Sequence, residues 1–249
     1  LSPVWDTALC CHALMEVGTG EALAHTMRGL DWLADRQVLD IRGDWSVKCG
    51  HLRPGGWAFQ YANPYYPDVD DTAVIVMAMD RARRDIPDVA SRYGRAIDRG
   101  REWVVGMRSR CGGWAAFDAD NTAYYLNSIP FADHGALLDP PTADVTARCV
   151  GMLAQLGREG DSNLIGTALR YLERTQEADG SWYGRWGMNY IYGTWSVLNA
   201  LGAAGVDARS PVVRRAVEWL VQCQNPDGGW GEDARSYDRN GYEASPSTA

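Results

Sequence analysis

WLVQCQNPDGGW, residues 219–230, is one of four segments that share one pattern and predict how the helices are joined. In each, an aromatic residue lies in a helical stretch, a polar residue follows five positions later, and a glycine-containing turn ends in tryptophan. A glutamine near a helix C-terminus can bond orphan carbonyls while the indole stacks over it, and glycine supplies the turn. We call each copy a Gln–Trp staple and expect it to fasten one helix end to the next. The other copies are WLADRQVLDIRGDW (32–45), WVVGMRSRCGGW (103–114, with Arg108 in place of glutamine) and YLERTQEADGSW (171–182).

The spacing of the staples predicts what lies between them. Neighbouring copies are far enough apart for a pair of helices with its loops. Helical periodicity dominates these intervals and strand alternation is scarce, so we expect an all-α fold of repeated helix pairs. Periodicity alone leaves open whether the pairs stack into a solenoid or close into an α/α barrel. The closing residues are Trp45, Trp114, Trp182 and Trp230.

Composition narrows the class of protein. A chain of 249 residues with 46% hydrophobic content can bury a substantial core. A net charge of -8 argues against a nucleic-acid partner, and the six cysteines form no C-x-x-C pair, so a zinc ribbon or redox motif is not expected. The longest apolar runs, such as residues 73–79, are far shorter than the roughly 20 residues of a membrane-spanning helix. The start without methionine or a signal-peptide pattern suggests a piece of a longer protein.

Two long irregular segments, residues 51–67 and 117–142, interrupt the helices, and loops of this length usually carry function. The first leads into YYPDVDDTAV, where Asp68, Asp70 and Asp71 crowd the start of a hydrophobic helix. One of them can be explained as a helix cap. Three carboxylates so close together in apolar surroundings repel one another, which raises one pKa and retains a proton. The helix N-terminus favours the ionised form after the proton leaves, so the cluster is typical of a strong general acid.

Carboxylate clusters also bind Mg²⁺ for pyrophosphate chemistry. The residues around this cluster are apolar and aromatic, whereas a pyrophosphate site needs basic residues and a further ligand. The four histidines show no paired zinc-ligand spacing. We therefore expect no metal and no cofactor.

Six motifs together resemble the squalene–hopene cyclases of bacteria, over essentially the whole chain. The D-x-D-D element alone also occurs in class II diterpene cyclases, and the staples alone in oxidosqualene cyclases, so both remain alternatives. Oxidosqualene cyclases keep a single essential aspartate, whereas this chain has three, which suits an alkene that is harder to protonate than an epoxide. The motifs are SPVWDT (2–7), GGWAFQ (55–60), DVDDTA (68–73), DPPTADVTA (139–147), GRWGMNYIYGTW (184–195) and QNPDGGWGED (224–233).

The resemblance implies roles for particular residues. Asp70 would donate the proton to the terminal alkene, while Asp68 and Asp71 would tune its acidity and help to reload it. Arg148 stands where several relatives have a histidine that supports the acid, and Asp144 would orient it. A permanently charged guanidinium can stabilise a carboxylate, but an ordinary helical ion pair is the competing explanation for these two residues.

The resemblance also implies a cavity lined with aromatic rings. Each ring stabilises a travelling carbocation by roughly 0.5–2 kcal/mol without trapping it. For any one aromatic residue, core packing is the competing explanation. The implied substrate-binding rings are Trp5, Phe59, Phe117 (tyrosine in some relatives), Trp186 and Tyr192.

For the whole protein, the resemblance implies an α/α barrel (toroid), with residues 1–249 forming most of one catalytic barrel that is incomplete at both ends. A second barrel and a C-terminal portion would lie outside. The activity would be an isomerase-type cyclisation of squalene to hopene in hopanoid biosynthesis, with hopanol formed by hydration. The enzyme would contact the cytoplasmic side of the bacterial inner membrane peripherally, through other segments, and a homodimer is compatible with it. A prenyltransferase-like toroid that binds isoprenoid and zinc, and a non-enzymatic helical-repeat binding module, stay open as other classes.

Overall fold

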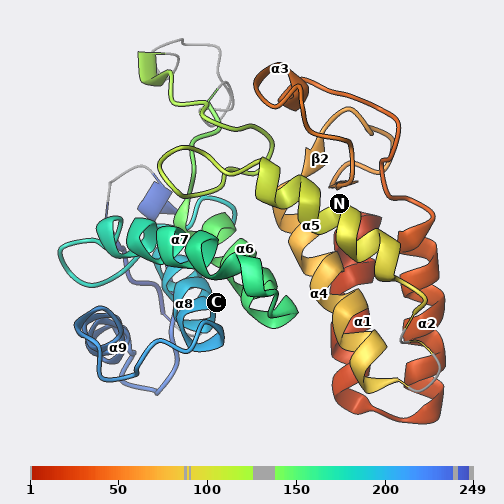
Figure 1. Cartoon of the computed structure of the whole chain (residues 1–249). Helices are drawn as coiled ribbons and strands as arrows, with labels where there is room; N and C mark the ends of the chain where they lie inside the picture. Colours follow the sequence, from red (N-terminus) through yellow and green to blue (C-terminus); the bar gives the residue numbers. More distant parts are fainter. Residues whose placement is uncertain (1, 87–88, 90, 126–137, 238–240, 247–249) are drawn as a thin grey trace. The chain divides into compact units, whose positions relative to one another are not determined.

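The computed structural model describes residues 2–246 except 87–88, 90, 126–137 and 238–240. The chain forms two compact units (Figure 1). Unit 1 comprises residues 1–110 and 114–141, and unit 2 comprises residues 111–113 and 142–249. Within the described residues both are helical, and the regular strands are two of two residues each. The all-α prediction is therefore confirmed.

Unit 1 is built around one buried helix, α4. Its residues 69–76 are all buried, and α1, α2 and α5 pack against it. Gly29 lets α1 and α2 approach closely, because a Cβ there would lie 2.6 Å from the Cys11 sulfur. The elements are α1 (Pro3–Val17), α2 (Gly20–Ala34), α3 (Trp45–Lys48), β1 (Trp57–Ala58), β2 (Pro67–Asp68), α4 (Val69–Asp85) and α5 (Gly94–Gly106).

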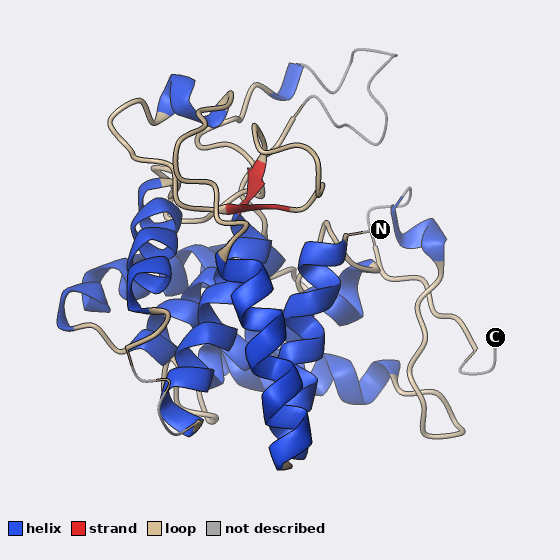
Figure 2. Ribbon diagram, turned by 90° about the vertical axis from the view of Figure 1, so that its right-hand side faces the viewer, coloured by secondary structure: helices blue, strands red, loops and turns tan. Residues whose placement is uncertain are grey.

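The irregular segment 51–67 contains a small antiparallel ladder. β1 pairs with β2, so that Trp57 lies opposite Asp68 and Ala58 opposite Pro67. Figure 2 shows these strands among loops at one end of the helices. Since α4 begins directly after β2, the ladder fixes where α4 starts. Much of the second irregular segment, residues 126–137, lies outside the described residues.

Unit 2 is a helical layer in which α8 packs on α6 and α9, and α7 packs on α6. The helix α6 is mostly buried, whereas α7 and α9 are amphipathic and bury one face. The elements are α6 (Ala143–Leu156), η3 (Glu159–Asp161), α7 (Ser162–Arg174), α8 (Asn189–Ala203), α9 (Pro211–Cys223) and η4 (Ala234–Tyr237).

The Gln–Trp staples are present as hydrogen bonds. In three copies the closing indole Nε1 donates to a carbonyl ten residues earlier: Trp114 to Val104, Trp182 to Leu172 and Trp230 to Leu220, at 2.6–2.8 Å. A glycine two residues before each of these tryptophans, Gly112, Gly180 or Gly228, has a φ between 92° and 102° that closes the helix end. Trp230 remains 46% exposed although its indole is bonded.

The side chains of two staple glutamines tie turns to neighbouring helices. The Gln37 amide donates to the carbonyls of Gly55 and Ala96, and the Gln176 amide to those of Gly180 and Val212. Gln224 donates to the Gly228 carbonyl. The prediction that a staple fastens one helix end to the next is confirmed for the copies with Gln37 and Gln176, whereas the Gln224 amide bonds within its own turn.

One assignment in the first staple was wrong. The indole that closes this copy belongs to Trp57, which donates to the Leu33 carbonyl at 2.7 Å, and not to Trp45. Trp45 starts the short helix α3 and packs edge-on against Trp103, with ring centroids 5.9 Å apart. After Gln37 the chain forms an irregular segment and the short helix α3 before it comes back to the end of α2. The tryptophan that reaches this helix end is therefore Trp57, and not Trp45, which comes first in the sequence.

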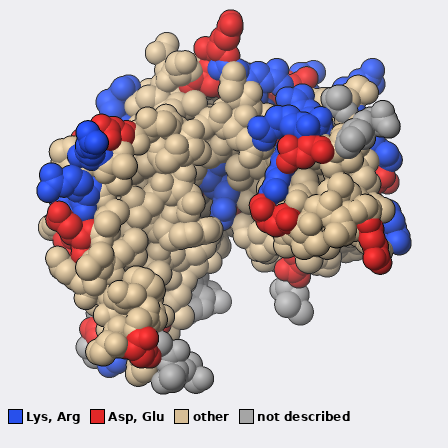
Figure 3. Space-filling view, turned by 90° about the horizontal axis from the view of Figure 1, so that it is seen from below, with Lys and Arg blue, Asp and Glu red and all other residues tan. Residues whose placement is uncertain are grey.

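The surface carries charges of both signs. In Figure 3 acidic and basic side chains lie in small mixed groups separated by uncharged surface. Several form ion pairs, among them Arg92 with Asp31 at 2.6 Å. Such exposed pairs each contribute little to stability. None of the helices in the described ranges is long and apolar enough to span a bilayer.

Candidate active site

The acid cluster forms the N-terminus of α4. Asp68 is the N-cap, and its Oδ1 accepts from the backbone N–H groups of Asp70 at 2.7 Å and Asp71 at 3.2 Å. The capping explanation is therefore correct for Asp68. It leaves Asp70 and Asp71 in the first helical turn, where the helix dipole acts on their carboxyl groups.

Two backbone connections fix the position of this turn. The Thr72 hydroxyl donates to the Asp68 carbonyl at 2.6 Å and accepts from the Trp57 backbone N–H at 3.0 Å, which joins the turn to β1. On the other side, the Val69 N–H donates to the Ala116 carbonyl at 2.8 Å. The cluster is thus held by segments that precede and follow it by many residues.

All three carboxyl groups are withdrawn from water. Asp68, Asp70 and Asp71 are 7%, 9% and 1% exposed. Burial, reinforced by the charges of Asp71 and Asp70, raises the pKa of Asp68. Burial, followed by the charge of Asp70, raises the pKa of Asp71 to about 8. The Asp71 Oδ1 is buried without a hydrogen-bond partner among the described residues. Burial and the neighbouring charges thus shift the pKa values of Asp68 and Asp71 upward, in the direction that favours a retained proton.

Two predicted rings of unit 1 follow residues that pair with the acid motif or with the residue directly before it. Phe59 comes directly after Ala58, which pairs with Pro67 in the ladder. Phe117 comes directly after Ala116, the acceptor for Val69. Phe59 is 36% exposed and Phe117 is half-buried, so neither ring is absorbed into the core. Trp5 is half-buried on α1, a helix that packs against α4.

The four predicted residues of unit 2 lie near one another. On α6, the Arg148 guanidinium donates to the Tyr192 hydroxyl of α8 at 3.3 Å. Asp144, also on α6, accepts from the Trp186 backbone N–H at 2.9 Å, and the Arg185 guanidinium lies 5.4 Å from the centroid of the Trp186 ring. Trp186 is 47% exposed. The packing of α6 on α8 thus gathers these side chains.

Asp144 makes contacts that the sequence did not suggest. Its carboxylate accepts from the N–H groups of Val145 and Trp186, so it anchors the segment that carries a predicted ring. The role of Asp144 in orienting Arg148 stays a prediction. The same holds for the prediction that the rings of both units surround one cavity with Asp70.

Sequence reasoning missed three residues with a clear part in this architecture. Thr72 joins the motif to β1, Asp139 accepts from three backbone N–H groups around Phe117, and Glu232 accepts from the first turn of α8, at Tyr190 and Ile191. Asp139 and Glu232 lie in quoted motifs, DPPTADVTA and QNPDGGWGED. Their acceptors and donors are far apart in sequence, so no local pattern reveals the pairing.

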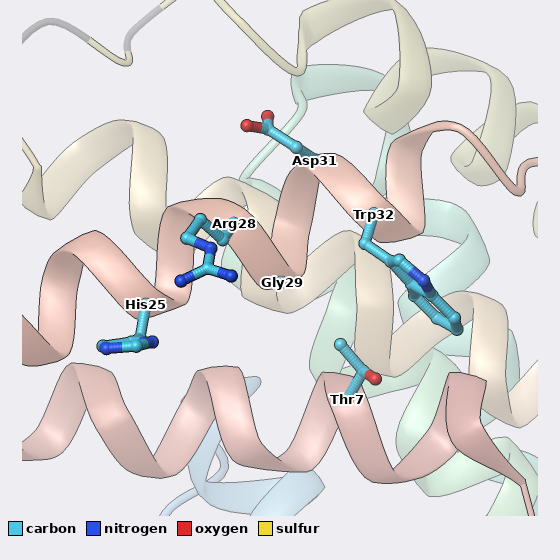
Figure 4. Close-up of a pocket in the computed structure, with 6 residues that line it drawn as sticks. All are labelled: Thr7, His25, Arg28, Gly29, Asp31 and Trp32. Carbon is cyan, nitrogen blue, oxygen red and sulfur yellow. The ribbon is translucent and has the colours of Figure 1, made fainter.

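A separate groove lies over α1 and α2 in unit 1. Figure 4 shows Thr7 pointing from α1 toward α2. The lining contains none of the predicted site residues: it consists of Thr7, His25, Arg28, Gly29, Asp31 and Trp32. Among the described residues, no group of three or more His, Cys, Asp or Glu side chains is placed to hold a metal ion.

Comparison with solved structures identifies the fold. The type II terpene cyclase MstE from Scytonema, in complex with geranylgeranyl dihydroxybenzoate, has a TM-score of 0.64 and 19% sequence identity over 95% of this chain and 59% of that chain. At this identity the likeness shows the fold, which is that of the α/α toroids of terpene cyclases.

The chain belongs to the squalene–hopene cyclase C-terminal domain family, whose model matches residues 1–249. It is 65% identical to the "Probable squalene–hopene cyclase" of Sinorhizobium fredii and 61% identical to the squalene–hopene cyclase of Bradyrhizobium diazoefficiens. Each alignment covers 100% of this chain but only 39% and 38% of the relative. The chain thus spans well under half the length of these relatives. The predicted resemblance is confirmed.

Proposed function

We propose that the protein containing this chain is a class II triterpene cyclase that protonates the terminal alkene of squalene and guides its polycyclisation to hopene. The observation that carries this proposal is the buried cluster of Asp68, Asp70 and Asp71 at the N-terminus of α4, with raised pKa values at Asp68 and Asp71. The family membership supports squalene as the substrate.

The first step transfers a proton from the Asp70 carboxyl to the CH carbon of the terminal alkene. The π bond supplies the electron pair for the new C–H bond, and a tertiary carbocation forms at the dimethyl-substituted carbon. Asp70 is left as a carboxylate, which the positive end of α4 stabilises. Successive alkenes then attack the cation to close rings. Loss of a proton gives hopene, and capture of water gives hopanol.

In this proposal Asp68 and Asp71 tune and reload the acid. The Asp68 carboxylate occupies the N–H groups of the first turn, which holds Asp70 and Asp71 in place. Asp71 shares the retained proton with its neighbours and can return it to Asp70. Arg148 would stabilise the conjugate carboxylate in the complete protein, with Asp144 and Tyr192 fixing α6 and α8 around it.

We further propose that the complete enzyme acts as a peripheral protein on the cytoplasmic side of the bacterial inner membrane. Squalene is wholly apolar and partitions into lipid, so an enzyme that consumes it gains from contact with a bilayer. Residues 1–249 would form most of one α/α barrel, and the remaining length of the relatives would supply the second barrel, the membrane contact and any dimer interface.

The experiment that tests the proposal is product analysis of the complete protein incubated with squalene. Asp70→Asn keeps the shape of the side chain and removes the transferable proton, so we expect turnover to fall by at least about three orders of magnitude with an unchanged circular dichroism spectrum. Asp120→Asn, a matched change in a loop of unit 1, should retain near-wild-type turnover. Hopene formation by Asp70→Asn at a near-normal rate would refute the general-acid assignment.

A further inference from the structure

The carboxylate of Asp139 binds the backbone N–H groups of residues 116–118, which we call the gripped turn. Its Oδ2 accepts from the N–H groups of Phe117 at 2.7 Å and Asp118 at 2.9 Å, and its Oδ1 accepts from that of Ala116 at 3.3 Å. Three successive amides that converge on one carboxylate form an anion-binding arrangement of the backbone. A side chain in this position fixes the orientation of all three peptide groups.

The gripped turn leads directly to the acid helix. The carbonyl of Ala116, whose own N–H is bound to Asp139, accepts from the Val69 N–H at 2.8 Å. Val69 is the first residue of α4 and lies between Asp68 and Asp70. The next two N–H groups of this helix, those of Asp70 and Asp71, donate to the side chain of Asp68, which belongs to the same motif. Ala116 therefore provides an anchor for the turn from outside the motif.

The far end of the gripped turn is also fixed. Trp114, two residues before Ala116, is fully buried and its indole donates to the Val104 carbonyl at the end of α5. Ala115 and Ala116 are buried as well. Between the staple and Asp139, residues 114–118 have little freedom to move, and a fixed carbonyl is a better anchor for α4 than one on a free loop.

We propose that Asp139 is a positioning residue for the cyclase reaction: by clamping residues 116–118 it sets both the N-terminus of α4, through Val69, and the ring of Phe117. This inference rests on the proposed function and extends it to a residue that reaches the acid helix through the backbone of Ala116. The Asp139 carboxylate acts through the backbone of Ala116, and its loss displaces the proton donor relative to the alkene.

Two substitutions test the two ends of this connection. Asp139→Asn replaces an accepting oxygen by an NH2 group that faces backbone N–H groups, so the clamp opens. Val69→Pro removes the N–H that Ala116 accepts, and its ring Cδ takes the place of that hydrogen, so the Ala116 carbonyl is pushed away from α4. Proline itself suits the first position of a helix. Asp68, which precedes it, has φ -103° and ψ 132°, a conformation that a following proline permits. Asp120→Asn is the matched control, because Asp120 accepts from Arg110 and not from residues 116–118.

In the complete protein with squalene, Asp139→Asn should lower kcat by about 10- to 100-fold, the effect of a displacement near 1 Å, with KM changed less than about twofold. Asp120→Asn should stay within about twofold in both. Asp139→Asn and Val69→Pro break the same connection, which runs from Asp139 through Ala116 to Val69. The double variant should therefore be no slower than the slower of the two single variants. A kcat of Asp139→Asn near wild type, a change confined to KM, or multiplying effects in the double variant would overturn the proposal.

Hydrogen exchange separates this inference from the proposed function. The amides of residues 69–71 should exchange at least about tenfold faster in Asp139→Asn than in wild type and Asp120→Asn, whatever the substrate. Unchanged exchange there would overturn the clamp even if squalene were converted. Failure of the wild-type protein to cyclise squalene, with faster exchange in Asp139→Asn, would reject the function and retain the clamp. If Asp139→Asn fails to fold, Val69→Pro with wild-type kcat overturns the proposal.

Discussion

Asp68 shows how one side chain serves structure and chemistry together. As the N-cap of α4 it accepts two backbone N–H bonds that favour its charged form, while burial and two neighbouring carboxyl groups oppose that charge. Burial is the larger effect, so its pKa is raised. The opposition means that the cluster can neither ionise fully nor stay fully protonated without cost, which is the property a proton donor needs.

The raised pKa of Asp71 has a consequence for stability. It lies at about 8 in the folded protein, above the ordinary value of 3.8. Between these values the folded state binds more protons than the unfolded chain, so the free energy of unfolding falls as pH rises, by at most about 1.4 kcal/mol per pH unit for one group. Asp71→Asn removes the ionising group and with it this fall in the free energy of unfolding. We therefore expect the thermal midpoint of the variant minus that of wild type to be larger at pH 8.5 than at pH 5.

Thermal unfolding of the complete protein at these two pH values measures this difference, with Asp120→Asn as the control that should follow wild type. Parallel behaviour of Asp71→Asn and wild type across the window would show that Asp71 ionises as an ordinary carboxyl group in the folded state.

At the residue scale, the sequence revealed the carboxyl cluster but not the residues that hold it in place. Three aspartates within four residues at a helix start are a local signal, and both the cap and the raised pKa values follow from it. Asp139 and Thr72 carry no such signal, because each acts on a backbone group brought near by folding. Asp144 was singled out by resemblance, yet its bond to the Trp186 backbone depends on the packing of unit 2.

At the scale of elements, the staples join helix ends by the same bonds in both units. The closing tryptophan was predicted correctly in the three copies that are twelve residues long. The prediction was wrong for the first copy because an inserted segment separates Gln37 from Trp57. The Gly-Gly-Trp sequence at 55–57 repeats that of 112–114 and was a usable signal. The short β1–β2 ladder has no periodic pattern, so it could not be predicted.

The corrected staple can be tested by a matched pair of substitutions. Trp57 and Trp45 are both buried, but the Trp57 Nε1 is bonded to the Leu33 carbonyl, whereas the Trp45 Nε1 has no partner among the described residues. Trp57→Phe loses that bond, while the Leu33 carbonyl keeps the backbone N–H of Arg36, so it should destabilise the protein by about 0.5–1.5 kcal/mol more than Trp45→Phe.

Chemical denaturation of the two variants measures the difference. A Trp45→Phe variant that is as unstable as Trp57→Phe, or less stable, would show that Trp45 takes part in the staple after all.

At the scale of the whole molecule, the two units divide the predicted site residues between them. Unit 1 holds the acid cluster with Trp5, Phe59 and Phe117, and unit 2 holds the remaining four. The family and the fold could be predicted because matched motifs run along the entire chain. The common cavity stays a prediction, because it depends on packing between segments far apart in the chain.

A change in products tests whether unit 2 contributes to that cavity. Trp186→Leu removes a ring that would stabilise a cationic intermediate by roughly 0.5–2 kcal/mol, so we expect a larger fraction of partly cyclised products. Trp230→Leu, at a similarly exposed staple tryptophan of the same unit, should change stability but not the product pattern. Gas chromatography of the products from the complete protein measures both. An unchanged pattern in Trp186→Leu would remove Trp186 from the cavity.

The most direct test of proton donation by the Asp68–Asp71 cluster is cyclisation of squalene by the complete protein in D2O. The acid exchanges its proton with solvent, so the hopene formed should carry one deuterium, in the ring methylene next to the dimethyl-substituted carbon that held the first cation. Asp70→Asn should form no labelled hopene. Hopene without deuterium at that methylene, or labelled hopene from Asp70→Asn at the wild-type rate, would contradict the account.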